Sequence, residues 1–278
     1  MLGAAIWLLA AGIVYGPVLA SLARHWSTDP TYSHGFVVPA LALFLVGQRR
    51  DELRRTPATP SAVGLLILAS SLGLFVVGSV GAELFVTRVS MIGVLAGTVV
   101  YAFGWRHLGL VAFPLAFLVF MIPLPSIVFG HFAVSLQLIA SQLGENLLRA
   151  ADVAVLRDGN LLKLATVTLE VNEACSGIRS LGTLVMMTTL IGYVFQPQAW
   201  GRVVLVAAAV PLAIGLNGLR IAVTGLGTLR FGPVATSDGV HTASGWVVFV
   251  VALACLWGMH RVMLSVARHP AERHLEAA

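Results

Sequence analysis

One cysteine of the sequence lies in surroundings that suit a nucleophile. Cys175 belongs to the run NEACSGIRSL (residues 172–181), where a polar segment leads into an apolar one. If Asn172 or Glu173 caps a helix here, Cys175 lies in its first turn, where the positive end of the helix dipole favours a thiolate. Arg179 follows one turn later on the same face, and its charge also stabilises a thiolate. The alternative is a buried cysteine that behaves as a small apolar side chain.

An arginine lies inside a second apolar segment. Arg220 belongs to the run NGLRI (217–221), and an arginine within a membrane-spanning helix is a candidate functional residue. Asn217, three residues earlier, lies on the same helical face, so the pair predicts a polar pocket. The alternative is an arginine whose side chain extends along the helix to the membrane interface.

A histidine opens the next apolar segment. His241 belongs to the run DGVHTASG (238–245), at the start of a predicted helix. A helix N-terminus disfavours imidazolium, so we expect a neutral His241 that can accept a proton. Asp238 is placed to orient this histidine, and Gly245 on the same face allows close approach of another helix. The alternative is a histidine that simply lies at the membrane interface.

These three groups are predicted to lie at a similar depth near one membrane face. Cys175 and His241 each begin a segment that runs inward, and Arg220 lies near the outer end of a segment that runs outward. A thiol nucleophile, a base and a fixed cation together suit acyl transfer: the thiolate attacks a carbonyl, the cation stabilises the oxyanion and the imidazole moves protons. A Ser/His/Asp arrangement is not supported, although Ser176 and Ser244 are present.

The composition places these residues in a membrane protein. Of the 278 residues, 58% are hydrophobic and only 10% are charged, so the chain needs lipid as its solvent. The net charge of +5 fits basic cytoplasmic loops, and no basic run is interleaved with aromatic residues as in a nucleic-acid-binding surface. Two cysteines are too few for a disulfide framework, and we expect Cys255 to behave as an apolar residue. No metal-ligand spacing occurs, so we predict no metal and no cofactor.

Apolar stretches near the roughly 20 residues needed to cross a bilayer predict about eight transmembrane helices. The first lacks a cation before its apolar run, which favours a spanning helix over a signal peptide. The most basic loop, residues 48–55, and the basic C-terminal tail fall on one side, so the positive-inside rule makes both termini cytoplasmic. The candidate spans are residues 3–23, 36–48, 61–80, 89–104, 107–122, 177–196, 202–229 and 242–264.

Residues 123–174 are predicted to form an extracytoplasmic insertion within a single transmembrane domain, residues 1–278. An amphipathic pattern over 126–150 suits a helix that lies on the outer leaflet. Asp158-Gly159 between two β-prone runs, the second over 161–171, predicts a hairpin. The fold class is therefore an all-α polytopic membrane protein of about eight transmembrane helices with a small helix-plus-hairpin insertion. The apolar face of the amphipathic helix holds Leu136, Ile139, Leu143 and Leu147.

Four blocks of the sequence together resemble the exosortase/archaeosortase family, and they cover most of the chain. The run EACSGIRSL (173–181) is similar to the family's nucleophile motif, and NGLRI (217–221) is similar to its arginine motif. The run DPTYSHGF (29–36) looks like the family's outer loop. A histidine in the third motif favours the bacterial exosortases, because archaeal relatives typically place an arginine there. The third motif is matched by His241, Gly245 and Phe249.

This resemblance implies an enzyme of the bacterial inner membrane, a cysteine transpeptidase or protease. Its partners would be membrane lipid and proteins that end in a PEP-CTERM sorting signal, which is a Pro-Glu-Pro motif, a spanning helix and a basic tail. Cleavage at the periplasmic face would pass the protein to an acceptor (water, an amine or a lipid head group), in connection with exopolysaccharide or biofilm export. By this carry-over Cys175 is the nucleophile, Arg220 stabilises the oxyanion or substrate, and His241 is the general acid/base. Substrate contacts are implied for Arg179, Tyr32, His34 and Asn217.

Two other functions stay open from the residues alone. A small transporter would have Arg220 and His241 line a substrate path, but transporters usually place polar sites near the midplane of repeated halves. Here the polar groups are predicted near one face and no repeat is evident. A non-catalytic assembly factor for polysaccharide secretion would make Cys175 incidental, and it predicts that Cys175→Ala has no effect.

Overall fold

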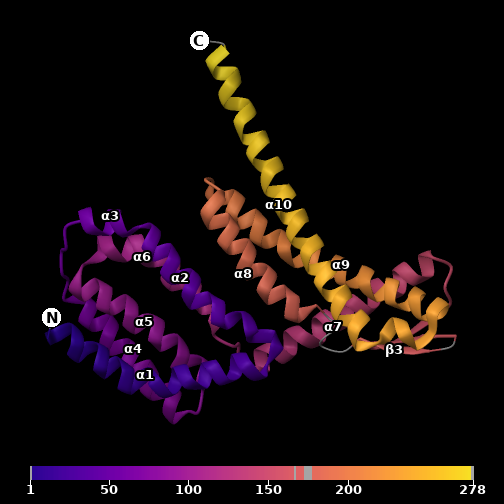
Figure 1. The fold of residues 1–278 in the computed structure, drawn as a ribbon, viewed down its shortest axis with the longest axis horizontal. Coiled ribbons are helices and arrows are strands. Elements are labelled where there is room, and N and C mark those ends of the chain that lie inside the picture. Colours follow the sequence, from indigo (N-terminus) through magenta and orange to yellow (C-terminus); the bar gives the residue numbers. More distant parts are fainter. Residues whose placement is uncertain (1, 166, 172–176, 277–278) are drawn as a thin grey trace. The chain divides into compact units, whose positions relative to one another are not determined.

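The computed structural model describes residues 2–165, 167–171 and 177–276, with the backbone alone described at 2–5, 8 and 267–276. In this part of the chain, seven helices are long and apolar enough to cross a membrane (Figure 1). A shorter apolar helix spans Trp105–Met121. The prediction of an all-α, multi-pass membrane protein is confirmed.

The chain forms two compact units, Met1–Phe129 and Gly130–Ala278. The boundary falls a few residues after position 123, where the predicted insertion starts. The single domain predicted over 1–278 stays a prediction.

Unit 1 is helical throughout its described residues. Helices α4 and α5 form its most extensive helix–helix interface and run antiparallel. Gly64 of α4 lies against the backbone of Tyr101 of α5. Small residues at such contacts let two spanning helices approach closely. The elements are α1 (Leu2–Thr28), η1 (Pro30–Phe36), α2 (Val37–Gln48), α3 (Arg50–Arg55), α4 (Val63–Val80), α5 (Leu84–Ala102), α6 (Trp105–Phe117), η2 (Leu118–Met121) and the start of α7 (Ser126–Ala150).

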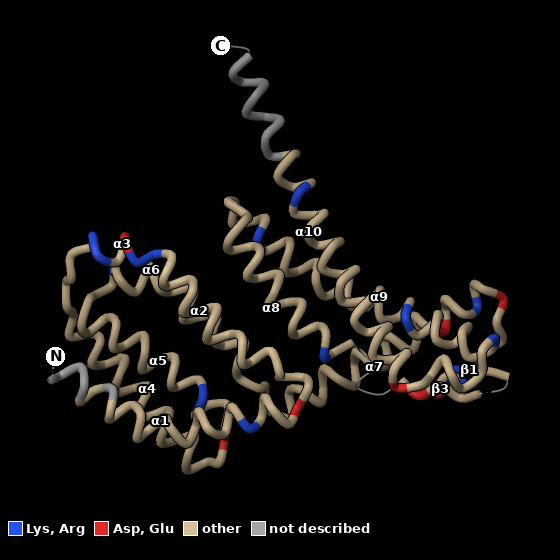
Figure 2. Tube along the Cα trace, in the orientation of Figure 1, with Lys and Arg blue, Asp and Glu red and all other residues tan. Residues whose placement is uncertain are grey.

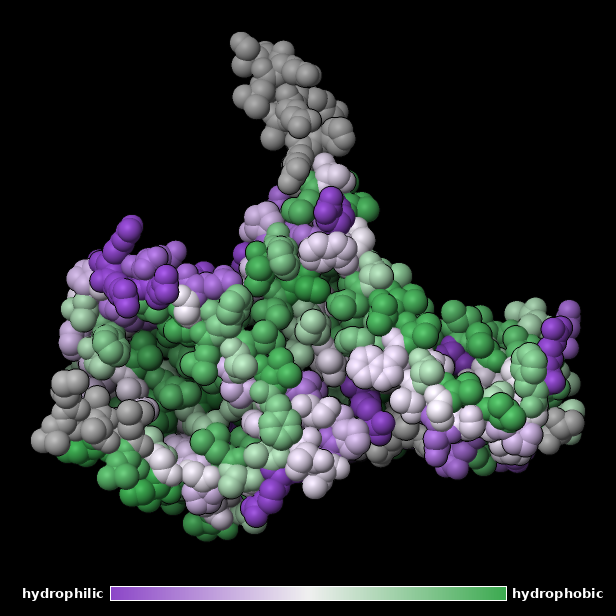
Figure 3. Space-filling model, in the orientation of Figure 1, coloured by the Kyte–Doolittle hydropathy of each residue, from purple (hydrophilic) through white to green (hydrophobic). Residues whose placement is uncertain are grey.

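Charged residues of unit 1 gather at the ends of its helices. Figure 2 shows the basic cluster at α3, which corresponds to the basic loop predicted to be cytoplasmic. Figure 3 shows hydrophobic side chains over the visible faces of the helices, and large apolar residues such as Leu43, Leu66 and Val77 are more than 60% exposed, at 72%, 71% and 66%. Surfaces of this kind are stable against lipid rather than water.

The predicted spans differ from the observed helices mainly at their ends. The span predicted at 36–48 is extended by η1 into a continuous helical stretch, Pro30–Gln48. Helix α5 begins at Leu84 instead of residue 89, because the Glu83 carboxylate accepts a hydrogen bond from the amide of Phe85 at 3.2 Å and caps the helix. The sequence prediction had excluded Arg88 from the span, whereas the structure includes it.

Helix α7 buries one face against protein. Its buried residues recur every three or four positions and include Leu136 and Leu148. A helix at 126–150 is confirmed, and part of its apolar face packs on protein: Leu136 is buried and Leu147 packs on the core formed with the sheet and α9, while Ile139 is 47% exposed. Its length and composition also make α7 a candidate span, which the sequence prediction had not included. Its place on the outer leaflet stays a prediction.

The insertion ends in a three-stranded antiparallel sheet in the order β1 (Val155–Asp158), β2 (Leu161–Leu164), β3 (Thr168–Glu170). Asp158 pairs with Leu161, so the hairpin predicted from Asp-Gly is confirmed. Gly159 has a φ of 63°, which suits a glycine in a two-residue hairpin turn. The second β-prone run does not form one long strand: it divides into β2 and β3, which pair with each other.

Three long helices complete unit 2: α8 (Ile178–Phe195), α9 (Ala199–Phe231) and, after the turn η3 (Gly232–Thr236), α10 (Asp238–Glu276). The three pack against one another in pairs. Their common core contains Leu184 from α8, Ala209 and Ala213 from α9, and Ala252 and Leu256 from α10. This core fixes how α9 and α10 face each other, and that contact positions the polar groups described next.

Candidate active site

Arg220 of α9 and His241 of α10 are in direct contact. Nη2 of Arg220 lies 2.7 Å from Nε2 of His241 and donates to the His241 backbone carbonyl at 2.9 Å. Nε of Arg220 donates to the hydroxyl oxygen of Ser244 at 3.0 Å. The Ser244 hydroxyl in turn donates to the same His241 carbonyl at 2.8 Å. The structure therefore brings Arg220 and His241 together, as the topology argument predicted.

Packing on the opposite face of α9 explains why Arg220 points toward α10. Gly218 lies against Leu143 of α7, and Gly225 lies against Leu148, so small residues of α9 let α7 approach closely. Arg220 does not belong to this buried face and is half-buried. Its guanidinium passes Gly245 of α10, where an added Cβ would lie 3.7 to 3.8 Å from the guanidinium atoms.

A cavity of about 390 Å³ lies beside this contact. Arg220 and His241 line it together with two carboxylates, Glu170 at the end of β3 and Asp238 at the start of α10. Val171, which directly follows β3, also lines the cavity. The cavity therefore combines a fixed cation, an imidazole and two acids, which is a set of groups that can move protons and stabilise an anion.

An apolar groove of about 550 Å³ continues from Arg220 along α9 and α10. Arg220 and Thr224 line both spaces, and Ser244 lines the groove. The remaining groove residues are apolar, and several of them, such as Val223 and Val247, are largely exposed, at 59% and 62%. Arg220 thus lies where a polar space meets an apolar one.

Cys175 lies outside the described residues, and so do the neighbouring positions 172–176. Helix α8 begins at Ile178, with Gly177 as its N-cap, and the cap predicted at Asn172 or Glu173 lies outside the described residues. Gly177 has a φ of 80°, in the left-handed region that favours glycine, and directly precedes the first helical residue.

Asn217 is 2% exposed and belongs to the buried face of α9. It lies directly against Gly177, because a Cβ added to that glycine would meet Cγ of Asn217 at 3.1 Å. Asn217 therefore supports the chain where it enters α8, one helical turn from Arg220. Its predicted contact with substrate stays a prediction.

Arg179 is exposed in the first turn of α8. It is not among the described residues that line the cavity beside Arg220 and His241. The predicted position of Arg179 one turn after Cys175 stays a prediction, because Cys175 lies outside the described residues. Cys255 is exposed on α10 and lines neither of the two spaces next to Arg220.

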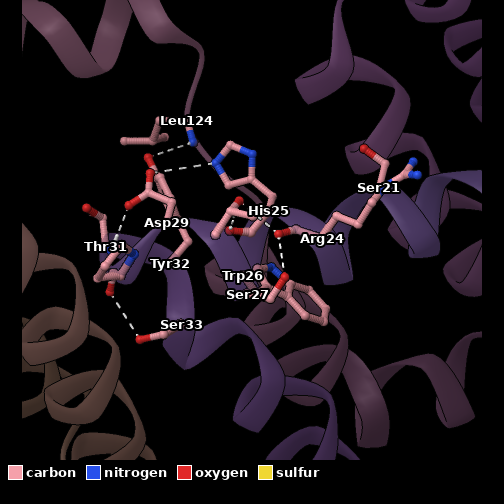
Figure 4. A network of polar contacts seen from close by, with 12 residues as sticks. Ser21, Arg24, His25, Trp26, Ser27, Asp29, Thr31, Tyr32, Ser33 and Leu124 are labelled. Carbon is pink, nitrogen blue, oxygen red and sulfur yellow. Dashed lines mark hydrogen bonds and ion pairs between the residues drawn. The ribbon is translucent and has the colours of Figure 1, made fainter.

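The Tyr32/His34 segment belongs to unit 1 and forms the turn η1 (Figure 4). The Tyr32 hydroxyl accepts a hydrogen bond from the amide of Leu124 at 3.3 Å, and its ring lies 5.3 Å from that of His25. Asp29 caps the turn by accepting from the amide of Thr31 at 2.8 Å. The ring of His34 lies 6.4 Å from that of Tyr32. These contacts order the segment within unit 1, and its contact with substrate stays a prediction.

Sequence reasoning did not assign Ser244 and Glu170 to the site. Ser244 had been considered only as a nucleophile of a serine hydrolase, whereas its hydroxyl binds Arg220. Its position three residues after His241, on the same helical face, was the available signal. Glu170 lines the cavity because the third strand, which was not predicted, ends there. Among the described residues, no group of three or more His, Cys, Asp or Glu side chains forms a metal site.

Comparison with known proteins identifies the family. Searches of curated proteins and of solved structures gave no match. The family model of the transmembrane exosortases matches residues 26–258, which include Tyr32, Cys175, Arg220 and His241. The match covers most of the chain and agrees with a multi-pass membrane protein whose polar site lies between apolar helices. The chain therefore belongs to the transmembrane exosortase family, whose members are membrane-embedded proteases and transpeptidases for protein sorting.

Proposed function

We propose that this exosortase is a cysteine transpeptidase or protease that cuts C-terminal PEP-CTERM sorting signals at the periplasmic face of the bacterial inner membrane. It passes the cut protein to an acceptor, and this reaction serves exopolysaccharide or biofilm export. Cys175 is the nucleophile, Arg220 stabilises the oxyanion and His241 is the general acid/base.

The contact between Arg220 and His241 beside a cavity is the observation that carries this proposal. A guanidinium and an imidazole 2.7 Å apart lie in helices that are otherwise apolar. In the sequence, Cys175 falls between Val171, which lines the cavity, and Gly177, which packs on Asn217. The two described neighbours of the cysteine segment thus lie close to the Arg220 turn of α9.

These groups suffice for a two-step acyl transfer. The proton of the Cys175 thiol passes to Nε2 of His241 while the sulfur bonds to the carbonyl carbon of the scissile peptide. The guanidinium of Arg220 donates to the oxyanion that forms. The carbon–nitrogen bond then breaks, the leaving amine takes the proton from His241, and a thioester remains. Attack by the acceptor, which gives up a proton through His241, releases the product and restores the thiol.

The charges around the cavity support a particular placement of the substrate motif. The glutamate of a Pro-Glu-Pro motif would be repelled by Glu170 and Asp238, which both line the cavity beside Arg220. Arg179 is exposed at the start of α8 and lies outside that lining. The motif glutamate therefore binds Arg179 more favourably, while Arg220 binds the oxygen of the scissile carbonyl.

Processing of a co-expressed PEP-CTERM protein tests this proposal. The wild type and Cys175→Ala are compared at matched membrane levels, with gel mobility and product mass as readouts. Cys255→Ala is the matched control, because it removes the other cysteine, which lies exposed on α10. We expect uncut substrate with Cys175→Ala and normal cleavage with Cys255→Ala. The mass of the wild-type product identifies water, an amine or a lipid head group as the acceptor.

The same experiment separates the enzyme from a non-catalytic assembly factor. Cleavage that continues at the wild-type rate in Cys175→Ala refutes the nucleophile assignment. If wild type also leaves the signal intact while Cys175→Ala supports normal polysaccharide secretion, the assembly-factor function replaces the protease.

A further inference from the structure

The hydrogen bond between Arg220 and His241 determines which ring nitrogen carries a proton. A guanidinium has only donors, so Nη2 of Arg220, at 2.7 Å, must donate to Nε2 of His241. Nε2 is therefore the acceptor and holds no proton. In this arrangement His241 is neutral, with its proton on Nδ1.

Ser244 fixes the guanidinium in the orientation that makes this bond. The single hydroxyl proton of Ser244 is given to the His241 carbonyl at 2.8 Å. Its oxygen is left to accept from Nε of Arg220, at 3.0 Å. The His241 carbonyl accepts from Nη2 of Arg220 as well, at 2.9 Å. Residues of α10 thus hold Nε and Nη2, two neighbouring donors of the Arg220 guanidinium. Because this group is planar, Nη2 points at the imidazole ring of His241.

We propose that Ser244 is a positioning residue that holds Arg220 on the lone pair of His241, so that the imidazole becomes a base only when substrate draws Arg220 away. This inference rests on the proposed function, because it concerns how the same site is activated. One lone pair on Nε2 cannot accept from Arg220 and from the Cys175 thiol at once. The carbonyl oxygen of the bound substrate takes over the Nη2 donor, and Nε2 is then free to accept the thiol proton.

The groups around His241 agree with this order of events. Arg220 faces the ring from α9, Glu170 lines the same cavity from β3, and Asp238 lines it from α10. Gly245 lets α10 pass close to the guanidinium, since an added Cβ would lie 3.7 Å from Nη2, in ordinary van der Waals contact. Arg220 lines this cavity, so a substrate bound there can reach its guanidinium.

If the Ser244 hydroxyl only bonds to a carbonyl of its own helix, its removal should have no larger effect than the loss of that bond elsewhere. Another serine of α10 provides the matched control. Serine hydroxyls in helices often bond to a carbonyl one turn earlier without any further function. Ser265, in the same helix, makes the same bond to the carbonyl of Val262 at 2.8 Å. Removal of the Ser265 hydroxyl reports the effect of losing that local bond alone.

The test combines a readout of the histidine ring with cleavage kinetics. Full-length protein labelled with 15N-histidine is studied without substrate in lipid nanodiscs, and His241→Gln assigns the His241 signals. We expect the wild type to show a protonated Nδ1 and an unprotonated Nε2. Ser244→Ala mixes the two neutral forms, Ser244→Thr restores the wild-type signals, and Ser265→Ala leaves them unchanged.

In cleavage assays, we expect Ser244→Ala to lower kcat about tenfold, as for the loss of one hydrogen bond to a charged group, with KM changed less than about twofold. Ser244→Thr recovers the rate and Ser265→Ala keeps it. Wild-type ring signals in Ser244→Ala overturn the inference, and so does a rate that falls equally in Ser265→Ala. The nitrogen signals decide the inference even if no substrate is cleaved, whereas the Cys175→Ala comparison decides the proposed function.

Discussion

Arg220 and Arg88 both lie inside apolar helices of this protein, and their surroundings differ. Arg220 of unit 2 is half-buried, bonds to Ser244 and His241, and lines a cavity. Arg88 of unit 1 is 3% exposed and donates to the hydroxyl of Ser21 at 3.2 Å. Its Nε has no hydrogen-bond partner among the described residues. Arg220 is held at a space that a ligand can enter, whereas Arg88 is enclosed by packing.

The comparison shows that an arginine in a spanning helix does not by itself indicate a site. Both residues lie in helices that are long and apolar enough to cross a membrane, and by that criterion they are equal. What distinguishes Arg220 is a titratable partner, a pair of acceptors that fixes its plane, and an adjacent cavity. Each of these features makes a separate prediction.

The largest effect is expected when the forked geometry of Arg220 is lost and its charge is kept. In Arg220→Lys, one ammonium cannot reach Ser244, the His241 carbonyl and Nε2 of His241 in one plane. We expect substrate processing to fall about 100-fold or more, as when an oxyanion donor is removed, with an unchanged melting temperature. A lysine variant that keeps more than about a tenth of the wild-type rate would show that charge alone is sufficient.

A smaller effect is expected when the space beside the Arg220 guanidinium is filled. An added Cβ at Gly245 would lie 3.7 to 3.8 Å from that guanidinium, which is ordinary contact. Gly245→Ala should therefore change the cleavage rate less than about twofold, while the branched Gly245→Leu should displace Arg220 and lower the rate about tenfold. Equal rates in both variants, measured at equal membrane levels, would mean that Arg220 has room to move aside without loss.

Much of this arrangement followed from the sequence. The apolar segments predicted the helices, and Asp158-Gly159 predicted the hairpin, because both signals are local. The meeting of Arg220 and His241 followed from the direction of consecutive spans, since both were expected near the same end of their helices. The contact of Ser244 with Arg220 could not be predicted from the sequence. Helical spacing shows which face of α10 carries Ser244, but not which helix packs on that face.

One difference has a physical cause in packing. Helix α7 was expected to bury its apolar face in lipid, but part of that face packs on α9, where Gly218 and Gly225 allow a close approach. The span predicted at 177–196 agrees with α8, which begins at Ile178 after the left-handed Gly177.

Arg88 sharpens the comparison by predicting almost no loss of function. Replacing a buried, incompletely bonded charge with an apolar side chain of similar length is often neutral or stabilising. We expect Arg88→Met to keep the cleavage rate within about twofold and to leave the melting temperature equal or higher. Tyr15, which bonds to Ser90 in the same unit at 3.0 Å, provides a control, since Tyr15→Phe removes a fully paired polar group. Loss of cleavage in a stable Arg88→Met protein would give Arg88 a role in the site.

The smallest effect is expected for an exposed cation, Lys163 of β2, which lies 2.9 Å from a carboxylate oxygen of Asp158. The hydrogen bond from Lys163, with its charge, lowers the pKa of Asp158 below the ordinary value for aspartate. The interaction therefore stabilises the folded hairpin at pH values above the ordinary pKa of aspartate. This stabilisation is lost as the pH falls through the lowered pKa. Hydrogen exchange of the β1–β2 amides should show less protection at pH 3 than at pH 6, by under about twofold because exposed pairs contribute little. Asp158→Asn should remove this pH dependence, and a pH dependence that persists in the variant would assign it to another group of the sheet.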